Sequence, residues 1–110
     1  MLAKKLRLST EDFSAFARKH PNTTRRGAFF TVKNYATASS TARFGVIVST
    51  KVDARASERN RIKRIAYDFF RDSGATLPAR DYACIAQPSA AGKTAEELRA
   101  DLAMIFGVRN

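Results

Sequence analysis

The sequence predicts a two-layer α/β sandwich of the α+β class, with helices packed on a small mixed sheet. Three observations favour this fold. The chain has 110 residues, the length of one ordinary domain, and 45% of them are hydrophobic, which is enough for a core. Helical and strand patterns follow one another along it without an internal repeat. We therefore expect a single domain over residues 1–110.

The chain opens with a helical pattern that is followed by a polar stretch. Ser9 can cap a helix, and Asp12 stands three residues later, where the partner in a capping box belongs. We expect this helix to run to about His20, because Pro21 cannot continue it. Residues 21–27, PNTTRRG, are polar and turn-prone, so we interpret them as a connector.

Three stretches have the composition of strands. Residues 28–35, AFFTVKNY, are aromatic and β-branched, with alternate side chains on opposite faces. After a small-residue loop at 36–42, residues 43–52 have a nearly continuous apolar centre, which predicts burial on both faces. The run at 81–88, DYACIAQP, is the third strand and ends at a proline.

Two more helices complete the order helix, strand, strand, helix, strand, helix. Residues 57–73 predict a helix that Gly74 is suited to end. Thr94 and Glu97 have the spacing of a capping box before the last helix. The apolar stripe of that helix consists of Leu98, Leu102, Ile105 and Phe106. Residues 43–87 thus form a strand–helix–strand unit.

The chain is strongly basic, with 20 Lys and Arg against 10 Asp and Glu, and a net charge of +10. Residues 1–26 hold seven bases and two acids, and residues 51–73 hold seven bases and four acids. Residues 74–110 hold four of each. This distribution favours a polyanionic partner met by two segments that the fold brings together. A membrane surface is the rival partner, but the basic segments lack a Trp-rich apolar stripe.

The helix over residues 57–73 separates its apolar and basic side chains. At about 100° per residue, one stripe gathers the apolar positions. These are Ile62, Ile65, Ala66 and Phe69. The opposite side gathers hydrogen-bonding side chains around Tyr67. These are Arg59, Asn60, Lys63, Arg64 and Arg71. Like charges four residues apart repel, and no glutamate relieves them there, so this face favours phosphate binding. A merely solvated basic face is the alternative.

Other sequence features limit the class of protein. No apolar run is long enough for a membrane span or a secretory signal, so we expect a cytoplasmic protein. Cys84 is the only cysteine, which excludes an internal disulfide and a cysteine-based metal cluster. His20 is the only histidine and has no nucleophile arranged around it. We therefore predict no catalytic side chain, no metal site and no cofactor bound by the chain.

The segment RNRIKR at residues 59–64 resembles the arginine-rich signature of the bacterial ribonuclease P protein subunit. LRLSTEDF looks like the opening helix of that family, RFGVIVSTKV like its central strand, and DYACIAQP like its later strand. TAEELRADL resembles the last helix. These matches cover nearly the whole chain in the order and spacing of the family.

The resemblance implies a fold, a role and partners. The fold would be ribosomal protein S5 domain 2-like, with a left-handed βαβ crossover where general rules favour a right-handed one. The protein would bind ribonuclease P RNA and the 5′ leader of precursor tRNA, and would assist endonucleolytic removal of the leader. The RNA would carry the chemistry with bound Mg²⁺. No membrane or DNA partner is expected.

The resemblance also assigns site residues by position. The RNA-contacting positions are Lys51, Arg59, Asn60, Arg61, Lys63, Arg64 and Arg71. The leader-contacting positions are Phe13, Phe16, Phe30 and Lys33. On the helix, Arg61 lies away from the centre of the basic face, so we expect it to pair with Asp68 or to reach a separate phosphate. For Phe13, burial in a core is the alternative to leader contact.

Four positions depart from the family pattern. Ala17 stands where a second aromatic is usual, with Phe16 one residue earlier. Lys33 replaces a tyrosine, so it can hold a phosphate but offers no stacking face. Residues 53–55, Asp-Ala-Arg, replace a glycine-containing stretch, and Gln87 stands where a base is common.

Two other functions compete with this one. A general RNA-binding protein of the ribosomal type would share the charge and the fold but would not activate a catalytic RNA. A self-sufficient nuclease would need acidic metal ligands or a histidine acid–base pair, and the sequence offers neither.

Overall fold

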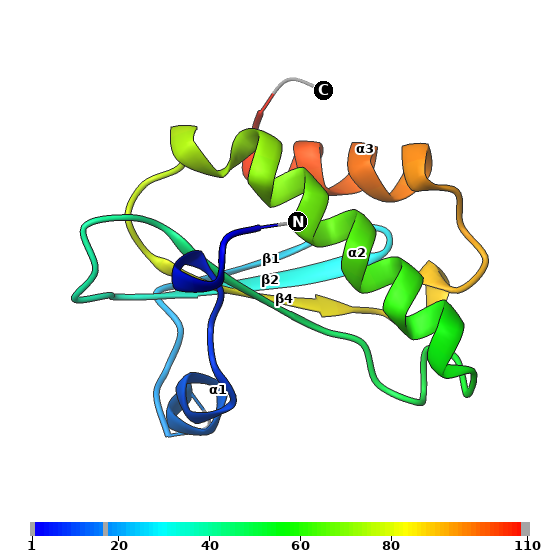
Figure 1. The fold of residues 1–110 in the computed structure, drawn as a ribbon, viewed down its shortest axis with the longest axis horizontal. Coiled ribbons are helices and arrows are strands. Elements are labelled where there is room, and N and C mark those ends of the chain that lie inside the picture. The colour runs from blue at the N-terminus through cyan, green and yellow to red at the C-terminus, as the bar shows by residue number, and fades with distance from the viewer. Residues whose placement is uncertain (1, 17, 109–110) are drawn as a thin grey trace.

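The computed structural model describes residues 2–16 and 18–108 (Figure 1). Short 3₁₀ turns alternate with helices and strands along the chain. The elements are η1 Lys4–Leu6, α1 Thr10–Phe16, β1 Thr23–Arg26, β2 Phe30–Tyr35, β3 Arg43–Ile47, α2 Ala56–Ser73, η2 Gly74–Thr76, β4 Asp81–Ala86, η3 Pro88–Ala90 and α3 Ala95–Phe106. Within the described residues, no helix is long and apolar enough to cross a membrane.

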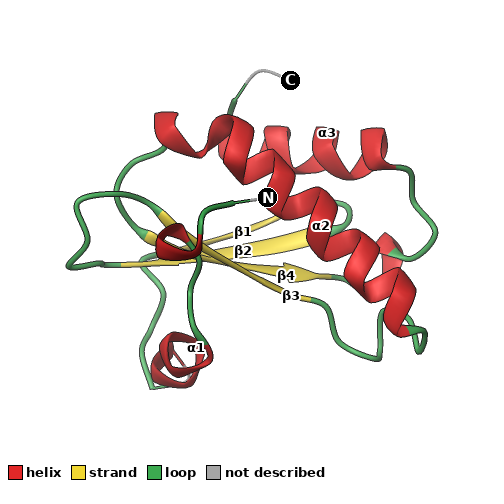
Figure 2. Ribbon diagram, in the orientation of Figure 1, coloured by secondary structure: helices red, strands yellow, loops and turns green. Residues whose placement is uncertain are grey.

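The strands of the described chain form one four-stranded sheet in the order β1-β2-β4-β3. β1 and β4 flank β2 as antiparallel neighbours, while β3 runs parallel to β4. Figure 2 shows α2 and α3 together on one side of this sheet and α1 on the other. The predicted small mixed sheet under helices is therefore confirmed, with α1 added on the second face. The hand of the β3–α2–β4 crossover stays an expectation.

The main core fills the space between the sheet and the pair α2–α3. All four residues of the predicted α2 stripe are buried there. Leu98, Leu102 and Ile105 of α3 are buried as expected, and Phe106 packs against the same cluster. The helical period thus identified the sides that face the sheet.

The capping box predicted for α1 forms in full, and the one predicted for α3 forms its Thr94 cap. The amide of Asp12 donates to Ser9 Oγ at 3.1 Å, and the amide of Ser9 donates to the Asp12 carboxylate at 2.8 Å. At the start of α3, the Glu97 amide donates to Thr94 Oγ1 at 3.1 Å. These contacts satisfy amides that the first turn of a helix leaves without partners.

Two segments near the N-terminus differ from the prediction. α1 ends at Phe16 and not near His20, because the chain tightens there into a turn in which the Lys19 amide donates to the Phe16 carbonyl. The expected connector at 21–27 contains β1. All four β1 residues are exposed, so no apolar pattern marks the strand, and its register with β2 defines it.

The second predicted strand is shorter and less buried than expected. β3 ends at Ile47, and Ile47 keeps 38% of its surface exposed. β3 lies at an edge of the sheet, where only the residues beneath α1 are covered on the second face. The apolar centre of residues 43–52 is therefore not buried on both faces over its whole length.

The turn between β1 and β2 is held from α3 by a buried carboxylate. Asp101 is 6% exposed and accepts backbone hydrogen bonds from Ala28, Phe29 and Phe30 at 2.8, 3.0 and 3.1 Å. A Cβ on Gly27 would lie 2.5 Å from Asp101 Oδ1, so a side chain there would displace the carboxylate. This contact fixes the sheet against α3 and starts β2 at Phe30, two residues later than predicted.

We expect Asp101→Ala to lower the free energy of unfolding by about 3 kcal/mol, because it leaves three amides without their acceptor. Chemical denaturation measures this change. Glu96→Ala, an exposed carboxylate on the same helix, is the control and should cost under about 1 kcal/mol. Equal losses of unfolding free energy in the two variants would show that the three hydrogen bonds to Asp101 do not stabilise the fold.

Candidate nucleic-acid interface

Part of the predicted basic face of α2 is open to a ligand. Asn60 and Arg64 are exposed and Lys63 is half-buried, while Lys51 is exposed in the loop that precedes α2. Among residues 2–16 and 18–108, none of these four side chains has a hydrogen bond or ion pair within the protein. Their donors are therefore free to bind an acidic partner.

Tyr67 does not lie in the middle of that open surface as expected. Its hydroxyl accepts a hydrogen bond from the Val46 amide of β3 at 3.2 Å. β3 is an edge strand, and an unpaired edge amide needs a partner. Tyr67 therefore turns toward the sheet and closes its edge.

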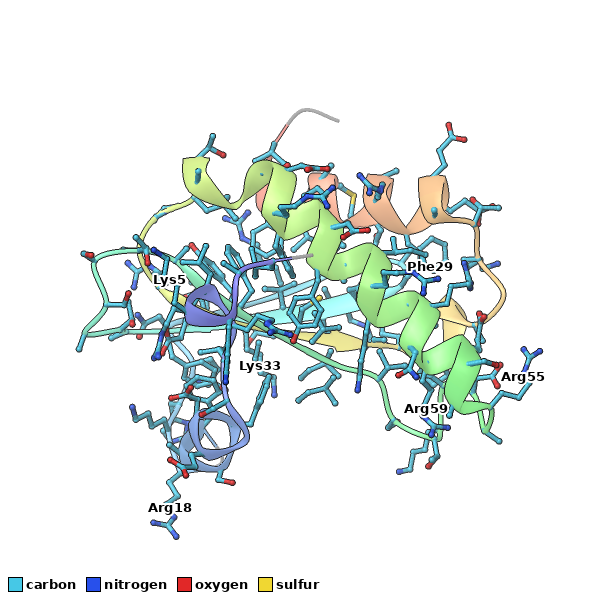
Figure 3. The ribbon with its side chains drawn as sticks, in the orientation of Figure 1. Lys5, Arg18, Phe29, Lys33, Arg55 and Arg59 are labelled. Atoms are coloured by element: carbon cyan, nitrogen blue, oxygen red, sulfur yellow. The ribbon has the colours of Figure 1, made fainter. Side chains whose placement is uncertain are left out.

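Arg59 anchors the loop between β3 and α2 (Figure 3). Its Nη1 donates to the carbonyls of Asp53 and Ala54 at 3.0 and 2.8 Å. The Asp53 carboxylate accepts from the Arg55 guanidinium and amide, and these bonds hold the pKa of Asp53 down at about 2. The Arg59 guanidinium lies beside the open surface, and its hydrogen bonds fix the loop that carries Lys51.

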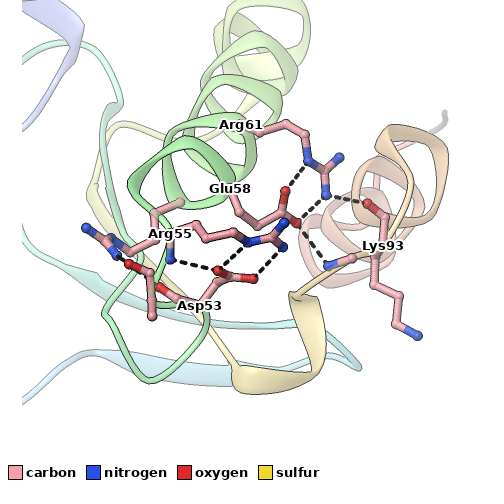
Figure 4. A network of polar contacts seen from close by, with 8 residues as sticks. Asp53, Arg55, Glu58, Arg61 and Lys93 are labelled. Carbon is pink, nitrogen blue, oxygen red and sulfur yellow. Dashed lines mark hydrogen bonds and ion pairs between the residues drawn. The ribbon is translucent and has the colours of Figure 1, made fainter.

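Arg61 belongs to a different side of α2 (Figure 4). Its Nε and Nη2 donate to both oxygens of Glu58 at 2.8 and 2.7 Å, and Nη2 also donates to the Lys93 carbonyl at 2.7 Å. Glu58 accepts a further bond from the Gly92 amide at 2.9 Å. The carboxylate partner is therefore Glu58 and not the expected Asp68, and the network joins α2 to the segment before α3.

Arg71 lies at the opposite end of the face and is ion-paired. Its guanidinium lies 3.1 Å from Asp72 and 3.6 Å from Asp68. The pairs are half-exposed, so they are weak and a phosphate can exchange with them. Arg71 also lines a mostly apolar cavity of about 480 Å³ together with Leu6 of η1, so the N-terminal segment lies near this end of α2.

A second surface lies on the face of the sheet that carries α1. Phe13 is half-buried, and its ring occupies the place of a side chain at Gly45, where a Cβ would collide with Phe13 Cζ. Phe16 is buried and stacks on Tyr35 with ring centroids 4.1 Å apart. Phe16 thus supports α1, and Tyr35, which the sequence reasoning did not single out, is its platform.

Phe30 cannot contact a leader as the resemblance implied. Its exposed fraction is 0%, and it belongs to the main core on the side of α2 and α3. Alternation along β2 assigns Phe30 and Lys33 to opposite faces, so the two cannot share one binding surface.

The exposed part of the α1-side face combines cations with aliphatic surface. Lys33 pairs with Ala83, which pairs with Gly45, and the Phe13 ring lies against Gly45, so Lys33 and Phe13 lie at two ends of one row. In the next row Arg26 pairs with Thr31 on the same face. Sequence reasoning missed Arg26 because β1 was interpreted as a connector.

Comparisons with known proteins identify the family. The family model Ribonuclease P matches residues 2–108. The chain belongs to the ribonuclease P protein family. It is 37% identical over 82 residues to the ribonuclease P protein component of Azoarcus sp. (strain BH72), over 74% of this chain and 68% of that protein. The match to the component of Xanthomonas oryzae pv. oryzae is 39% over 66 residues, 60% of this chain and 46% of the relative.

Solved structures of ribonuclease P proteins share the fold. A mutant of the Staphylococcus aureus RNase P protein, described as defective in mRNA degradation, has a TM-score of 0.84 at 24% identity, over 94% of this chain and 87% of that one. The RNase P protein from Thermotoga maritima has a TM-score of 0.77 at 20% identity, over 94% and 98% of the two chains. The α+β fold with a four-stranded mixed sheet is thus that of the ribonuclease P protein family.

The departures from the family pattern have local explanations. Gln87 donates through Nε2 to the Gly27 carbonyl at 3.0 Å and to Thr31 Oγ1 at 3.3 Å, so it braces the β1–β2 turn. In the loop at 53–55 the Asp53–Arg55 pair shapes the chain. Ala17 lies outside the described residues.

Glu58 makes the α2–α3 junction sensitive to acid. The Arg61 guanidinium and then the Gly92 amide lower the pKa of Glu58 from 4.5 to about 2 in the folded protein. A lowered pKa contributes stability above pH 4.5, and the contribution is lost as the pH falls through 2. We expect Glu58→Gln to destabilise the protein at pH 7 and to approach the parent in stability near pH 2, as followed by chemical denaturation. A pH-independent difference would contradict this ion-pair account.

Proposed function

We propose that this chain is the protein subunit of a ribonuclease P ribonucleoprotein, in which ribonuclease P RNA removes the 5′ leader of precursor tRNA. The observation that carries the proposal is the outer surface of α2, where Asn60, Lys63 and Arg64 have no partner within the described protein. We expect the complex in the cytoplasm.

The chemistry of the α2 surface suits a folded RNA. Arg64 can bind phosphate oxygens in pairs, and Lys63 adds a compact charge. Asn60 can both donate and accept, so it can contact a ribose hydroxyl or a base edge. In this proposal Mg²⁺ is held by the RNA and supplies the hydrolytic chemistry. The protein binds the catalytic RNA and positions the leader of the precursor tRNA.

The α1-side face of the sheet suits a single-stranded leader. Phe13 offers part of a ring for stacking, which contributes about 1–3 kcal/mol per base. Lys33 and Arg26 can neutralise phosphates on the same face, and exposed Ile47 adds apolar surface. Phe30 takes no part in this proposal, because it is buried on the other face.

Reconstitution tests the function. We expect cleavage of precursor tRNA at low Mg²⁺ only when the protein is mixed with ribonuclease P RNA. Arg64→Ala should weaken binding to that RNA and flatten the log–log salt slope by about 0.7–0.9 without unfolding the domain. Arg18→Ala, which removes an exposed charge at the far end of α1, is the matched control.

The alternatives predict different results in the same assay. RNA binding without activation would indicate a general RNA-binding protein, and cleavage by the protein alone would indicate a self-sufficient nuclease. Equal salt slopes for Arg64→Ala and the parent would refute the phosphate contact.

We expect Phe13→Ala to weaken binding of precursor tRNA by the reconstituted complex more than binding of mature tRNA, because only the precursor has a leader. Affinity measurements with both RNAs provide the test. Phe16→Ala is the comparison, since Phe16 is buried on Tyr35 and should lower stability without selecting between the RNAs. Equal losses of affinity for the two RNAs would mean that Phe13 contributes only to packing.

A further inference from the structure

The mostly apolar cavity at the C-terminal end of α2 lies on the side of the sheet that carries α2 and α3. Its volume of about 480 Å³ is within the range of about 300–1,000 Å³ that is typical of small-ligand sites. It is surrounded by η1, the loop at 36–42, β3, the last turn of α2 and the segment from η2 to Ala79. Figure 2 shows α1 on the other side of the sheet, so the cavity is separate from the α1-side face.

The walls of the cavity suit an apolar ring. Phe44 and Phe70 form the buried part of its lining and stack with ring centroids 4.3 Å apart. The lining also includes half-buried Leu6 and Leu77 and exposed Ala79. Because these last three side chains keep accessible surface, a ring that enters the cavity can pack on them without displacing the core.

The rim of the cavity carries a hydroxyl group that the protein does not use. Ser40 is exposed in the loop at 36–42 and lines the cavity. Within residues 2–16 and 18–108 its hydroxyl makes no hydrogen bond, whereas the hydroxyls of Ser39 and Thr41 bond to each other. A hydroxyl can donate and accept, so Ser40 can pair with the polar edge of a ring whose faces are apolar.

Cations lie on two sides of the cavity. Lys4 and Lys5 are exposed on η1, whose Leu6 lines the cavity, and the described part of the chain gives neither lysine an ion pair. Arg71 lines the cavity from α2, and its two half-exposed ion pairs with aspartates are weak enough for a phosphate to exchange with them. An apolar cavity between cations favours a ligand with an apolar ring between two negative charges.

We propose that this cavity takes up one unstacked nucleobase of a folded RNA. The base packs on Leu6 and Leu77, its polar edge meets the Ser40 hydroxyl, and the phosphates on either side contact Arg71 and the lysines of η1. Proteins read RNA at bulges and loops, where a base leaves the stack at small cost. The cavity continues the basic side of α2, because Arg71 belongs to both. The proposal rests on RNA binding under the proposed function and adds a base-binding site to it.

The test measures binding of the whole chain to three hairpin RNAs by fluorescence anisotropy. One hairpin has a single bulged adenosine, the second has an abasic residue at the bulge, and the third is fully paired. We expect the bulged adenosine to bind several-fold more tightly than the abasic bulge, because only it has a base to bury. Amide shifts of Ala75 and Ala79 in the ¹⁵N-labelled protein report the cavity, and that of Gly45 reports the α1-side face.

Variants separate the base contact from the charge contacts. Ala79→Phe fills the cavity and should bring the affinities for the bulged and abasic hairpins together. Ala100→Phe, at an exposed position of α3 outside the cavity, is the matched control and should keep the difference. Lys5→Gln should weaken binding of both hairpins alike and flatten the log–log salt slope by about 0.7–0.9, whereas Lys19→Gln, at an exposed position after α1, should not. Thermal melts establish that each variant is folded.

Equal affinities of the parent protein for the three hairpins, or no binding of any of them, would overturn the proposal. A preference for the bulged adenosine that survives in Ala79→Phe would overturn it as well, and so would shifts at Gly45 without shifts at Ala75 and Ala79. In each of these cases, activation of ribonuclease P RNA by the same protein would leave the proposed function standing. Failure to bind both the hairpins and ribonuclease P RNA would defeat both.

Discussion

Burial of one side of α2 against the sheet determines what this helix can offer to a ligand. Ile62 and Phe70 are fully buried, and at about 100° per residue their position fixes the direction of every other side chain. One flank then meets the segment before α3, where Arg61 pairs with Glu58. The other flank meets β3, where Tyr67 takes the Val46 amide. Only the outer side, with Asn60 and Arg64, remains for a large partner.

The carboxylates divide the basic residues into two groups. Arg61 is held by Glu58 and the Arg43 guanidinium by the buried Asp81, so these charges stabilise the fold and are costly to redirect. Exposed bases such as Arg64 and Lys51 have no such partner in the described chain. Net charge therefore overstates the number of cations available to a polyanion. The ion pairs show which cations are already engaged within the protein.

The sequence predicted the features that depend on residues close together along the chain. The period of α2 and α3 gave their buried sides, because the sheet needs an apolar stripe from each. β1 could not be found this way, since its four exposed residues are defined only by pairing with β2. The Arg61–Glu58 pair is a local contact at i,i+3 that helix spacing could have identified, whereas the Lys93 carbonyl and the Gly92 amide that complete the network depend on where the loop before α3 folds back. Phe30 was assigned to the leader by position in the family, although alternation along its strand separates it from Lys33.

The sheet separates the two surfaces proposed for RNA. Figure 1 shows α2 and α1 on opposite sides of the sheet, and Phe13 with Lys33 lies on the side of α1. Tyr67 accepts the Val46 amide at the edge of β3, and core side chains fill the space between α2 and the sheet. If the proposed function holds, a catalytic RNA on α2 and a leader on the α1-side face would meet around an end of the β3 edge. The loop that follows β3 carries exposed Lys51, and the hydrogen bonds of Arg59 and the Asp53–Arg55 pair shape this loop between the two surfaces.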